Sequence, residues 1–317
     1  MTHFDVFNGD ADGLCALHQL RLAAPRDAVL VTGVKRDIAL LQRVPARAGD
    51  TVTVLDLSAA VNHDALAALL ALGVTVEYVD HHYPGDLPVH PGLSAWIDTA
   101  PDTCTSAIVD RRLAGRYRPW AVAAAFGDNL VAAAHALATG LGLDTAQVGA
   151  LRELGECLAY NAYGDTEADL VIAPDALYRL LHRHVDPFAF IRAEAIVRDL
   201  AAIRCDDLTR ARAVQATPAG GGTICVLPDA AWSRRVRGAL ANELANAKPD
   251  RAHAVVTPDA AGRYTVSVRA PLATMTGADA LCRAFPHGGG RGAAAGINEL
   301  PPQDLPEFIR RFADAFR

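Results

Sequence analysis

The sequence predicts an α/β protein: a doubly wound, mainly parallel sheet followed by a second, smaller α/β domain. Two observations predict this class. Short β-type runs alternate with helical stretches through the first third of the chain, and such alternation is typical of a parallel sheet. The runs are apolar almost throughout, as in residues 52–55, which suits strands that helices cover on both faces.

The first domain is expected to span residues 1–204. Strands are predicted at residues 4–8, 28–34, 51–55 and 74–79. Helices are predicted between them, at residues 13–23, 38–43 and 61–72. From residue 102 to residue 204 apolar side chains recur at three- and four-residue spacing, which indicates a mostly helical region. Its last helix, residues 186–204, opens at Asp186-Pro187 and is interpreted as a connector.

The second domain is expected to span residues 205–317. Strands are predicted at residues 212–217, 223–227, 253–257 and 263–270, with a turn at residues 220–222. Helices are predicted at residues 233–246, 279–285 and 305–316. A glycine-rich loop follows the second of these helices.

Composition narrows the class of protein. The chain has 317 residues, 51% of them hydrophobic, and a formal net charge of -6, so a packed globular protein is expected and bulk attraction to long duplex DNA is not. The six cysteines contain no C-x-x-C pair, which argues against a zinc cluster and a disulfide scaffold. We find no signal-peptide pattern and no apolar run that could span a bilayer. No membrane partner and a cytoplasmic location are therefore expected.

Acidic residues gather at the predicted strand ends. Asp10 and Asp12 follow the first strand, Asp56 the third, and Asp80-His81-His82 the fourth; Asp128 lies between two helical runs. Ligands bind outside the carboxyl ends of parallel strands, so these side chains are expected to converge. Each motif alone has an ordinary explanation, since Asp and Gly favour turns and helix caps. Their joint occurrence at one edge of the sheet favours a functional site.

Converging carboxylates repel one another unless cations neutralise them. Carboxylate oxygens with one or two imidazole nitrogens suit Mn²⁺ best, with Mg²⁺, Co²⁺ or Zn²⁺ as alternatives. Two such ions, about 3.5–4 Å apart, would activate a bridging water for displacement at phosphorus.

These motifs resemble a known family. Asp80-His81-His82, together with residues 9–13, resembles the DHH phosphoesterase superfamily, and residues 288–296 resemble the glycine-rich motif of the DHH-associated C-terminal domain. The family includes RecJ-type exonucleases, oligoribonucleases that also dephosphorylate pAp, cyclic di-AMP phosphodiesterases and manganese pyrophosphatases. The resemblance covers nearly the whole chain.

The resemblance implies a role for each motif residue. It makes Asp10, Asp12, Asp56, His81 and Asp128 metal ligands, with Asp56 and Asp128 shared between two ions. His82 would face the substrate phosphate or the leaving group, and Asp80 would orient His81. Two departures weaken the match: Asn8 stands where relatives have a charged ligand, and Arg291 where they have histidine. Arginine can hold phosphate, but it cannot act as a general acid.

Further candidates are basic or glycine-rich. Glycines at 288, 289 and 290 would let backbone N–H groups approach a phosphate, helped by His287 and Arg291; a flexible surface loop is the alternative. We expect this loop to face the metal site across the domain boundary. Lys35 and Arg36 follow the second strand, where they would contact phosphate or belong to a solvated loop. The predicted substrate-binding residues are Lys35, Arg36, His287, Gly288, Gly289, Gly290 and Arg291.

Together these observations favour a cytoplasmic, Mn²⁺-dependent phosphoesterase of the nanoRNase or exonuclease type. Its expected substrate is a short single-stranded oligonucleotide or a nucleotide, because long tracking grooves need more positive charge. The alternatives are a cyclic dinucleotide phosphodiesterase and a degenerate nucleotide-binding sensor, which Asn8 and Arg291 would mark. Relatives of this size are commonly dimers, so a homodimer is a further alternative.

Overall fold

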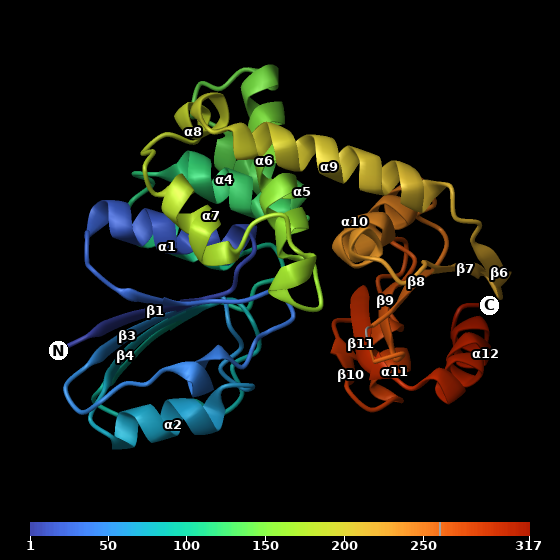
Figure 1. The fold of residues 1–317 in the computed structure, drawn as a ribbon, viewed down its shortest axis with the longest axis horizontal. Helices are drawn as coiled ribbons and strands as arrows, with labels where there is room; N and C mark the ends of the chain where they lie inside the picture. Colours follow the sequence, from blue (N-terminus) through green and yellow to red (C-terminus); the bar gives the residue numbers. More distant parts are fainter. Residues whose placement is uncertain (260) are drawn as a thin grey trace. The chain divides into compact units, whose positions relative to one another are not determined.

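The structure is a computed structural model that describes residues 1–259 and 261–317. It divides into two compact units, Met1–Ala201 and Ala202–Arg317 (Figure 1). Each unit is considered by itself. The domain boundary predicted after residue 204 lies three residues beyond this division, inside helix α9 (Ala195–Arg212).

The first unit contains a five-stranded sheet in the order β2-β1-β3-β4-β5. All four strand pairs are parallel, and they keep a continuous register along each strand. The strands are β1 (His3–Phe7), β2 (Val29–Val31), β3 (Thr51–Leu55), β4 (Thr75–Asp80) and β5 (Leu93–Ile97). The predicted parallel sheet is therefore confirmed. β5 is an addition to the prediction.

Helices cover both faces of this sheet, with α2 (His63–Ala71) on one side and α1 (Ala11–Ala23), α4 (Arg118–Gly127) and α7 (Pro174–Leu181) on the other (Figure 1). Neighbouring strand residues serve opposite faces: Val54 packs in the core beneath α2, whereas Leu55 packs in the larger core with α1 and α4. This follows from the two-residue period of a strand. The helices are α1 (Ala11–Ala23), α2 (His63–Ala71), α3 (Thr105–Arg112), α4 (Arg118–Gly127), α5 (Val131–Ala138), α6 (Thr145–Ala162), α7 (Pro174–Leu181) and α8 (Pro187–Ala193), with 3₁₀ turns at Leu40–Arg43 and Glu167–Asp169.

The predicted connector helix is wrong in detail. It is two helices, α8 and α9, because Glu194 has an extended backbone with φ -99° and ψ 118°. The Glu194 carboxylate pairs with His184 Nε2 at 2.8 Å, which ties the break to the preceding loop. α9 then continues to Arg212, so the strand predicted at residues 212–217 is also wrong; only Thr217–Ala219 forms one.

The second unit has a six-stranded mixed sheet in the order β10-β11-β9-β8-β7-β6. Among the strands that the structure describes in this unit, only β7 and β8 pair in parallel. The smaller second α/β unit agrees with the prediction. Its strands are β6 (Thr217–Ala219), β7 (Gly222–Val226), β8 (His253–Pro258), β9 (Tyr264–Arg269), β10 (Gly288–Gly290) and β11 (Ala294–Leu300). Its helices are α10 (Ala231–Ala247), α11 (Ala278–Arg283) and α12 (Leu305–Ala315), with a 3₁₀ turn at Pro302–Asp304.

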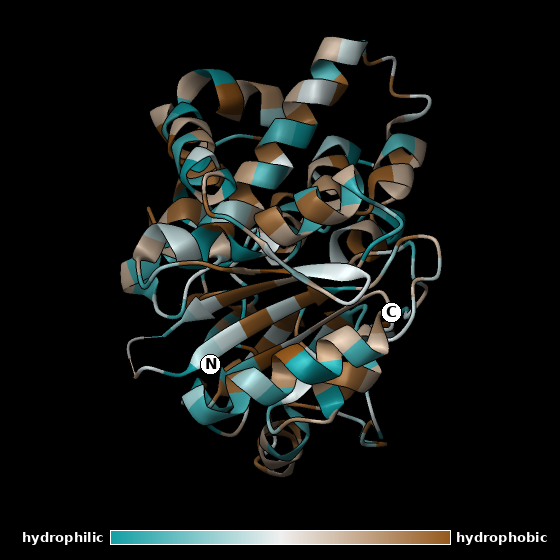
Figure 2. Cartoon of the chain, turned by 90° about the vertical axis from the view of Figure 1, so that its right-hand side faces the viewer, coloured by the Kyte–Doolittle hydropathy of each residue, from teal (hydrophilic) through white to brown (hydrophobic). Residues whose placement is uncertain are grey.

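The helices carry hydrophilic and hydrophobic residues on different sides (Figure 2), as expected of helices that pack one face on a core. In α12 the apolar side is Phe308 and Phe312, which are fully buried against the second sheet. Within the described part of the chain, no helix combines the length and the apolar character that crossing a membrane requires.

Candidate metal centre

The acidic motifs lie at the carboxyl ends of β1, β3 and β4. β1 is the first strand, and the chain returns across it from β2 to β3, so the strand order reverses between β1 and β3. Ligand sites of parallel sheets form at such switch points. Two glycines permit the sharp exit from β1: a Cβ at Gly9 would meet the Gly33 carbonyl oxygen at 2.2 Å, and one at Gly13 would meet the Asn8 carbonyl oxygen at 2.1 Å.

Asp10 caps α1 and faces the ammonium group of Lys35. Its Oδ1 accepts hydrogen bonds from the backbone N–H groups of Asp12 and Gly13, at 3.0 and 3.2 Å. Its Oδ2 pairs with Lys35 Nζ, which also lies 3.3 Å from Asp128 Oδ1. Burial would raise the pKa of Asp10, but Lys35 and the cap bonds lower this pKa to about 2. Asp10 is therefore ionised and already paired with a cation.

Asp12 is fully buried against the first turn of α3. Its two oxygens each accept a backbone hydrogen bond of 2.7 Å, from Thr105 and from Ser106, which are free donors at a helix N-terminus. Burial and the neighbouring Asp128 nevertheless raise the pKa of Asp12 to about 6. The hydrogen bonds from the helix N-terminus lower the pKa of Asp12, but less than burial and Asp128 raise it.

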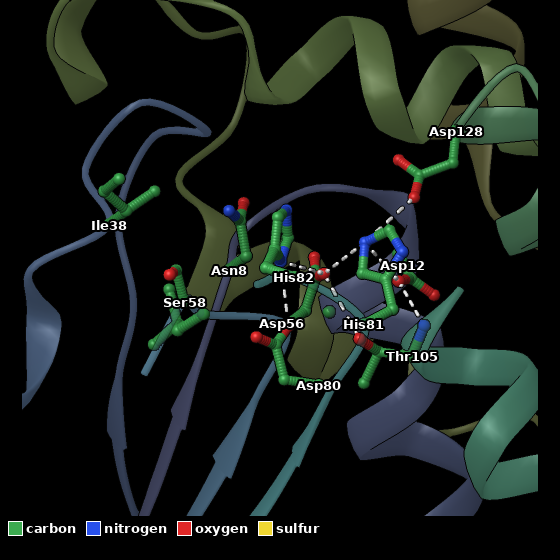
Figure 3. A network of polar contacts seen from close by, with 12 residues as sticks. Asn8, Asp12, Ile38, Asp56, Ser58, Asp80, His81, His82, Thr105 and Asp128 are labelled. Atoms are coloured by element: carbon green, nitrogen blue, oxygen red, sulfur yellow. Dashed lines mark hydrogen bonds and ion pairs between the residues drawn. The ribbon is translucent and has the colours of Figure 1, made fainter. Parts of the chain in front are cut away.

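Asp56 follows β3 and has a left-handed backbone, with φ 59°. Aspartate tolerates this conformation better than most residues, and here it accompanies a buried carboxylate close to the other acids (Figure 3). Burial first, and then repulsion from Asp12 and Asp10, raise the pKa of Asp56 well above its ordinary value. Without a cation, this repulsion between buried carboxylates lowers the free energy of unfolding.

His81 presents a ring nitrogen to the carboxylates. Its Nδ1 lies 2.9 Å from the carbonyl oxygen of Thr103, and because a carbonyl only accepts, Nδ1 carries the proton. Its Nε2 lies 3.4 Å from Asp56 Oδ1, 3.7 Å from Asp128 Oδ2 and 4.0 Å from Asp12 Oδ2. In a neutral ring this Nε2 has a lone pair facing three acidic oxygens.

That donor set fits a divalent cation. The described residues contain two groups whose ligand atoms all lie within 4.8 Å of one another: Asp12, His81 and Asp128, and Asp56, His81 and His82. A cation would replace repulsion between the lone pair and the oxygens by coordination, with the Thr103 carbonyl fixing the tautomer as an outer partner does in metal sites. Lys35, which contacts Asp10 and Asp128, already places one positive charge in this cluster.

Asp80 pairs with His82, where the resemblance implied His81. His82 Nδ1 lies 2.8 Å from Asp80 Oδ1, while His81 is oriented by Thr103. The reason is geometric: Asp80 ends β4, and the next residue but one turns its ring back to the fully buried carboxylate. Burial lowers the pKa of His82, but the Asp80 carboxylate outweighs this and raises the pKa.

Two predicted residues have other partners. The Asn8 amide oxygen accepts from the backbone N–H of Asp10 at 3.3 Å, and its amide nitrogen donates to the Lys35 carbonyl at 3.2 Å. Asn8 thus joins the two loops that bring Asp10 and Lys35 together. Arg36 pairs with Asp165. Metal binding by Asn8 and phosphate binding by Arg36 stay predictions.

The predicted glycine-rich loop is a β-hairpin of the second unit. Gly288–Gly290 pairs antiparallel with β11, and Arg291 and Ala294 exchange backbone hydrogen bonds of 2.8 and 3.1 Å across the turn. A Cβ at Gly288 would meet the Cys282 carbonyl oxygen at 1.8 Å, so packing against α11 accounts for this glycine. Phosphate binding by residues 287–291 stays a prediction.

Thr103, Thr105 and Ser106 are not among the site residues that the sequence predicts. The structure shows that Thr103 orients His81 and that the other two bind Asp12 through backbone N–H groups. The available signal was the start of a helix close after the acidic motifs, since such a start carries free N–H donors. A backbone carbonyl has no sequence signal.

Comparison with known proteins places the fold. No family model and no curated protein matches the chain. Among solved structures, a manganese-bound exonuclease RecJ matches with a TM-score of 0.67 and 22% identity, covering 99% of this chain and 90% of that one. The chain has the RecJ fold. The resemblance to DHH phosphoesterases is thereby confirmed at the level of the fold.

Other proteins share the RecJ fold with this chain. The Mn²⁺ complex of RecJ from Thermus thermophilus has a TM-score of 0.58 and 22% identity; 99% of this chain matches 52% of that one. A pGpG-specific phosphodiesterase from Vibrio cholerae has a TM-score of 0.55 and 13% identity, with 99% and 98% covered. The chain thus spans about half of the Thermus protein and nearly all of the Vibrio one.

Proposed function

We propose that this protein is a metal-dependent phosphoesterase that hydrolyses short single-stranded oligonucleotides or nucleotides. The observation that carries the proposal is the cluster of Asp12, Asp56 and Asp128 around Nε2 of His81, in which Asp12 and Asp56 are buried. Neighbours of the same fold include a nuclease and a phosphodiesterase, which supports phosphoester chemistry.

We propose two Mn²⁺ ions as the cofactor, with Mg²⁺, Co²⁺ or Zn²⁺ as substitutes. The manganese in two RecJ structures supports this choice. When bound, such ions supply an activated water and neutralise charge on the phosphate. The residues that would hold them are Asp10, Asp12, Asp56, His81 and Asp128, with Asn8 as a weaker candidate.

His82 is proposed to contact the reacting phosphate. Its Nδ1 is held by Asp80, so Nε2 is the nitrogen left for substrate, and the ring is partly exposed. Because Asp80 raises the pKa of His82, the ring binds a proton more readily at neutral pH. A protonated ring can stabilise charge on a phosphoryl oxygen or protonate the leaving oxygen. Asp80 acts through His82 as a positioning residue.

Phosphate binding is proposed for the basic residues and the glycine hairpin. Lys35 already neutralises two carboxylates, so its first effect is on the charge of the site. Arg36 and Arg291 can hold phosphate oxygens with a planar fork of donors. His287 and the three glycines of β10 complete the predicted set.

A cyclic dinucleotide phosphodiesterase is the second candidate. The Vibrio neighbour, which acts on the linear dinucleotide pGpG, has nearly the length of this chain, and that match supports a substrate of dinucleotide size, linear or cyclic. A nucleotide sensor without catalysis is the third. A homodimer and a cytoplasmic location are part of the proposal.

The test is a turnover screen with Mn²⁺ over pAp, dinucleotides, short RNA and DNA, cyclic di-AMP and pyrophosphate. We expect one phosphoester class to dominate. Asp80→Ala and His81→Ala should each lower kcat by about 10²-fold or more, the scale of a lost general acid–base group. Asp86→Ala is the matched control, because Asp86 is an exposed acid of the same loop.

Substantial activity in both variants would contradict the catalytic roles assigned to Asp80 and His81. A second outcome would contradict the enzyme itself. Nucleotide binding that needs no Mn²⁺ and survives Asp80→Ala, with no turnover of any substrate, would favour the sensor.

A further inference from the structure

A pocket of about 380 Å³ lies beside the metal centre, between the edge strand β5 and α3. It combines an exposed aromatic ring with two guanidinium groups. Its lining residues are Trp96, Ile97, Asp98, Ile108, Arg111 and Arg112. None of them belongs to the proposed catalytic set.

The pocket is joined to the catalytic residues by short connections. Ile97 is the register partner of Asp80 in the sheet, and the backbone N–H of Asp98 donates to the Asp80 carbonyl at 3.2 Å. Arg111 Nη1 donates to Thr103 Oγ1 at 3.0 Å, and the Thr103 carbonyl holds His81. These contacts place the pocket next to Thr103 and Asp80, the residues that hold His81 and His82.

The aromatic part of the pocket is suited to a nucleobase. Trp96 is 46% exposed although it is large and apolar. The guanidinium carbon of Arg112 lies 4.3 Å from the centre of its ring, so a planar cation lies over the aromatic ring. Bases bind to aromatic rings and to arginine planes by stacking, without dependence on base identity.

The charged part is suited to a phosphate. Arg111 pairs with Asp98 where both side chains are about half exposed, and such surface pairs contribute little, so an anionic oxygen can replace Asp98. Arg112 Nη2 is bound to Glu77 at 2.6 Å, whereas its buried Nη1 has no hydrogen-bond acceptor among the described residues. Because this atom is buried, a phosphate oxygen would reach it only if the Arg112 side chain turns toward the pocket.

We propose that this pocket binds one nucleotide of the substrate strand, next to the nucleotide whose phosphate is cleaved. Its base stacks on Trp96 and its phosphate contacts Arg111 and Arg112. The inference rests on the proposed function for its role in turnover. With this pocket, the enzyme should have a higher kcat/KM for strands that are long enough to fill the pocket than for small phosphodiesters.

Binding is tested without catalysis by fluorescence of the full chain in EDTA. The chain has three tryptophans, of which Trp120 is buried in the core. A short oligonucleotide should quench emission in the wild type and in Trp120→Phe, but not in Trp96→Phe. The fluorescence emission that Trp96→Phe removes is the emission that the oligonucleotide quenches in the wild type. Quenching that is identical in Trp96→Phe overturns the pocket.

Turnover is tested by the ratio of kcat/KM for a trinucleotide to that for bis-p-nitrophenyl phosphate. Loss of one stacked base is expected to lower this ratio roughly tenfold in Trp96→Ala, and Trp96→Phe should recover most of it. Arg111→Gln should lower the ratio in the same direction. Arg152→Gln is the matched control, since Arg152 forms an exposed ion pair on α6.

The two measurements separate the inference from the proposed function. Quenching through Trp96 without turnover of any substrate keeps the pocket and contradicts the enzyme. Turnover with an unchanged ratio in Trp96→Ala keeps the enzyme and overturns the pocket. Quenching by AMP alone, with the trinucleotide ratio unchanged, identifies a site for free nucleotides and overturns the strand proposal.

Discussion

Asp56 shows how function opposes stability at a single residue. Its carboxylate is buried beside other acids, which raises its pKa, and its backbone is left-handed. Asparagine accepts that backbone conformation too, so Asp56→Asn removes charge with little change of shape. The variant therefore measures how the charge of Asp56 affects the free energy of unfolding, with the packing of the side chain nearly unchanged.

We predict that Asp56→Asn raises the free energy of unfolding in EDTA by roughly 1–2 kcal/mol, because it removes a poorly compensated buried charge. The same change should weaken Mn²⁺ binding at least about tenfold, the low end of the cost of disturbing a metal site. Urea unfolding with and without Mn²⁺ checks both signs. A variant that is less stable in EDTA and binds Mn²⁺ normally would contradict the electrostatic account.

At the residue scale, the side chains with charge were the predictable ones. The acids and His81 were identified because carboxylates at adjoining strand ends have few structural uses. Lys35 was identified only as a basic residue near the site; its position between Asp10 and Asp128 depends on contacts between distant loops. The pairing of Asp80 with His82 depends on a ring rotation that residue order does not encode.

At the scale of the element, α6 positions Asp128 through a close approach to α4. Asp128 directly follows α4 and caps its C-terminal end. Gly155, in the middle of α6, lies so near α4 that a Cβ would meet the Ala123 carbonyl oxygen at 1.9 Å and the Gly127 nitrogen at 2.9 Å. Gly149, in the same helix, has no atom within 4 Å of an added Cβ.

These two glycines form a matched pair. Gly155→Ala should destabilise the fold by roughly 2 kcal/mol through overpacking and should weaken metal binding by moving Asp128. Gly149→Ala should instead stabilise by about 0.5–1 kcal/mol, the usual gain within a helix. Chemical denaturation and Mn²⁺ titration measure both. Equal effects of the two substitutions would contradict the close packing of α4 and α6.

A buried histidine joins α1 to the segment after α7. His18 Nε2 donates to the His184 carbonyl at 2.9 Å, so its Nδ1 accepts from His182 Nδ1 at 3.2 Å. Burial, reinforced by His182, lowers the pKa of His18 to about 3. The folded protein therefore keeps His18 neutral under conditions in which the unfolded chain protonates it.

This difference makes stability depend on pH. Between the unfolded pKa near 6.5 and the folded pKa of about 3, the unfolded state binds more protons, so the free energy of unfolding falls as pH falls. One such group contributes a slope of up to about 1.4 kcal/mol per pH unit. His18→Gln should reduce the slope between pH 6 and 4 in urea titrations. The exposed His63→Gln should not, and equal slopes for His18→Gln and the wild type would contradict this role.

Local pattern explains which elements were predictable. Apolar runs predicted β1, β3 and β4 within a residue or two, because each strand buries both faces. β5 was missed since its central residues, Ser94 to Trp96, are exposed. The Gly288–Gly290 strand has no strand propensity at all; pairing with β11 creates it. Edge strands of this kind form because of their pairing partners, so the local sequence does not predict them.

At the scale of the whole molecule, a protein with net charge -6 should gain stability from divalent cations at one place. If Asp12, Asp56 and Asp128 form this cation site, Mn²⁺ at 100 times its Kd should raise the free energy of unfolding by about 2.7 kcal/mol. Asp12→Asn should abolish most of this gain, and Asp86→Asn should not. A gain that is equal in all three proteins would indicate nonspecific screening.

Anomalous X-ray diffraction from crystals grown with Mn²⁺ tests the central claim most directly. We expect manganese peaks in contact with Asp12, Asp56, Asp128 and the Nε2 atom of His81. Full-occupancy manganese at other residues, with these four side chains free of metal, would contradict the account.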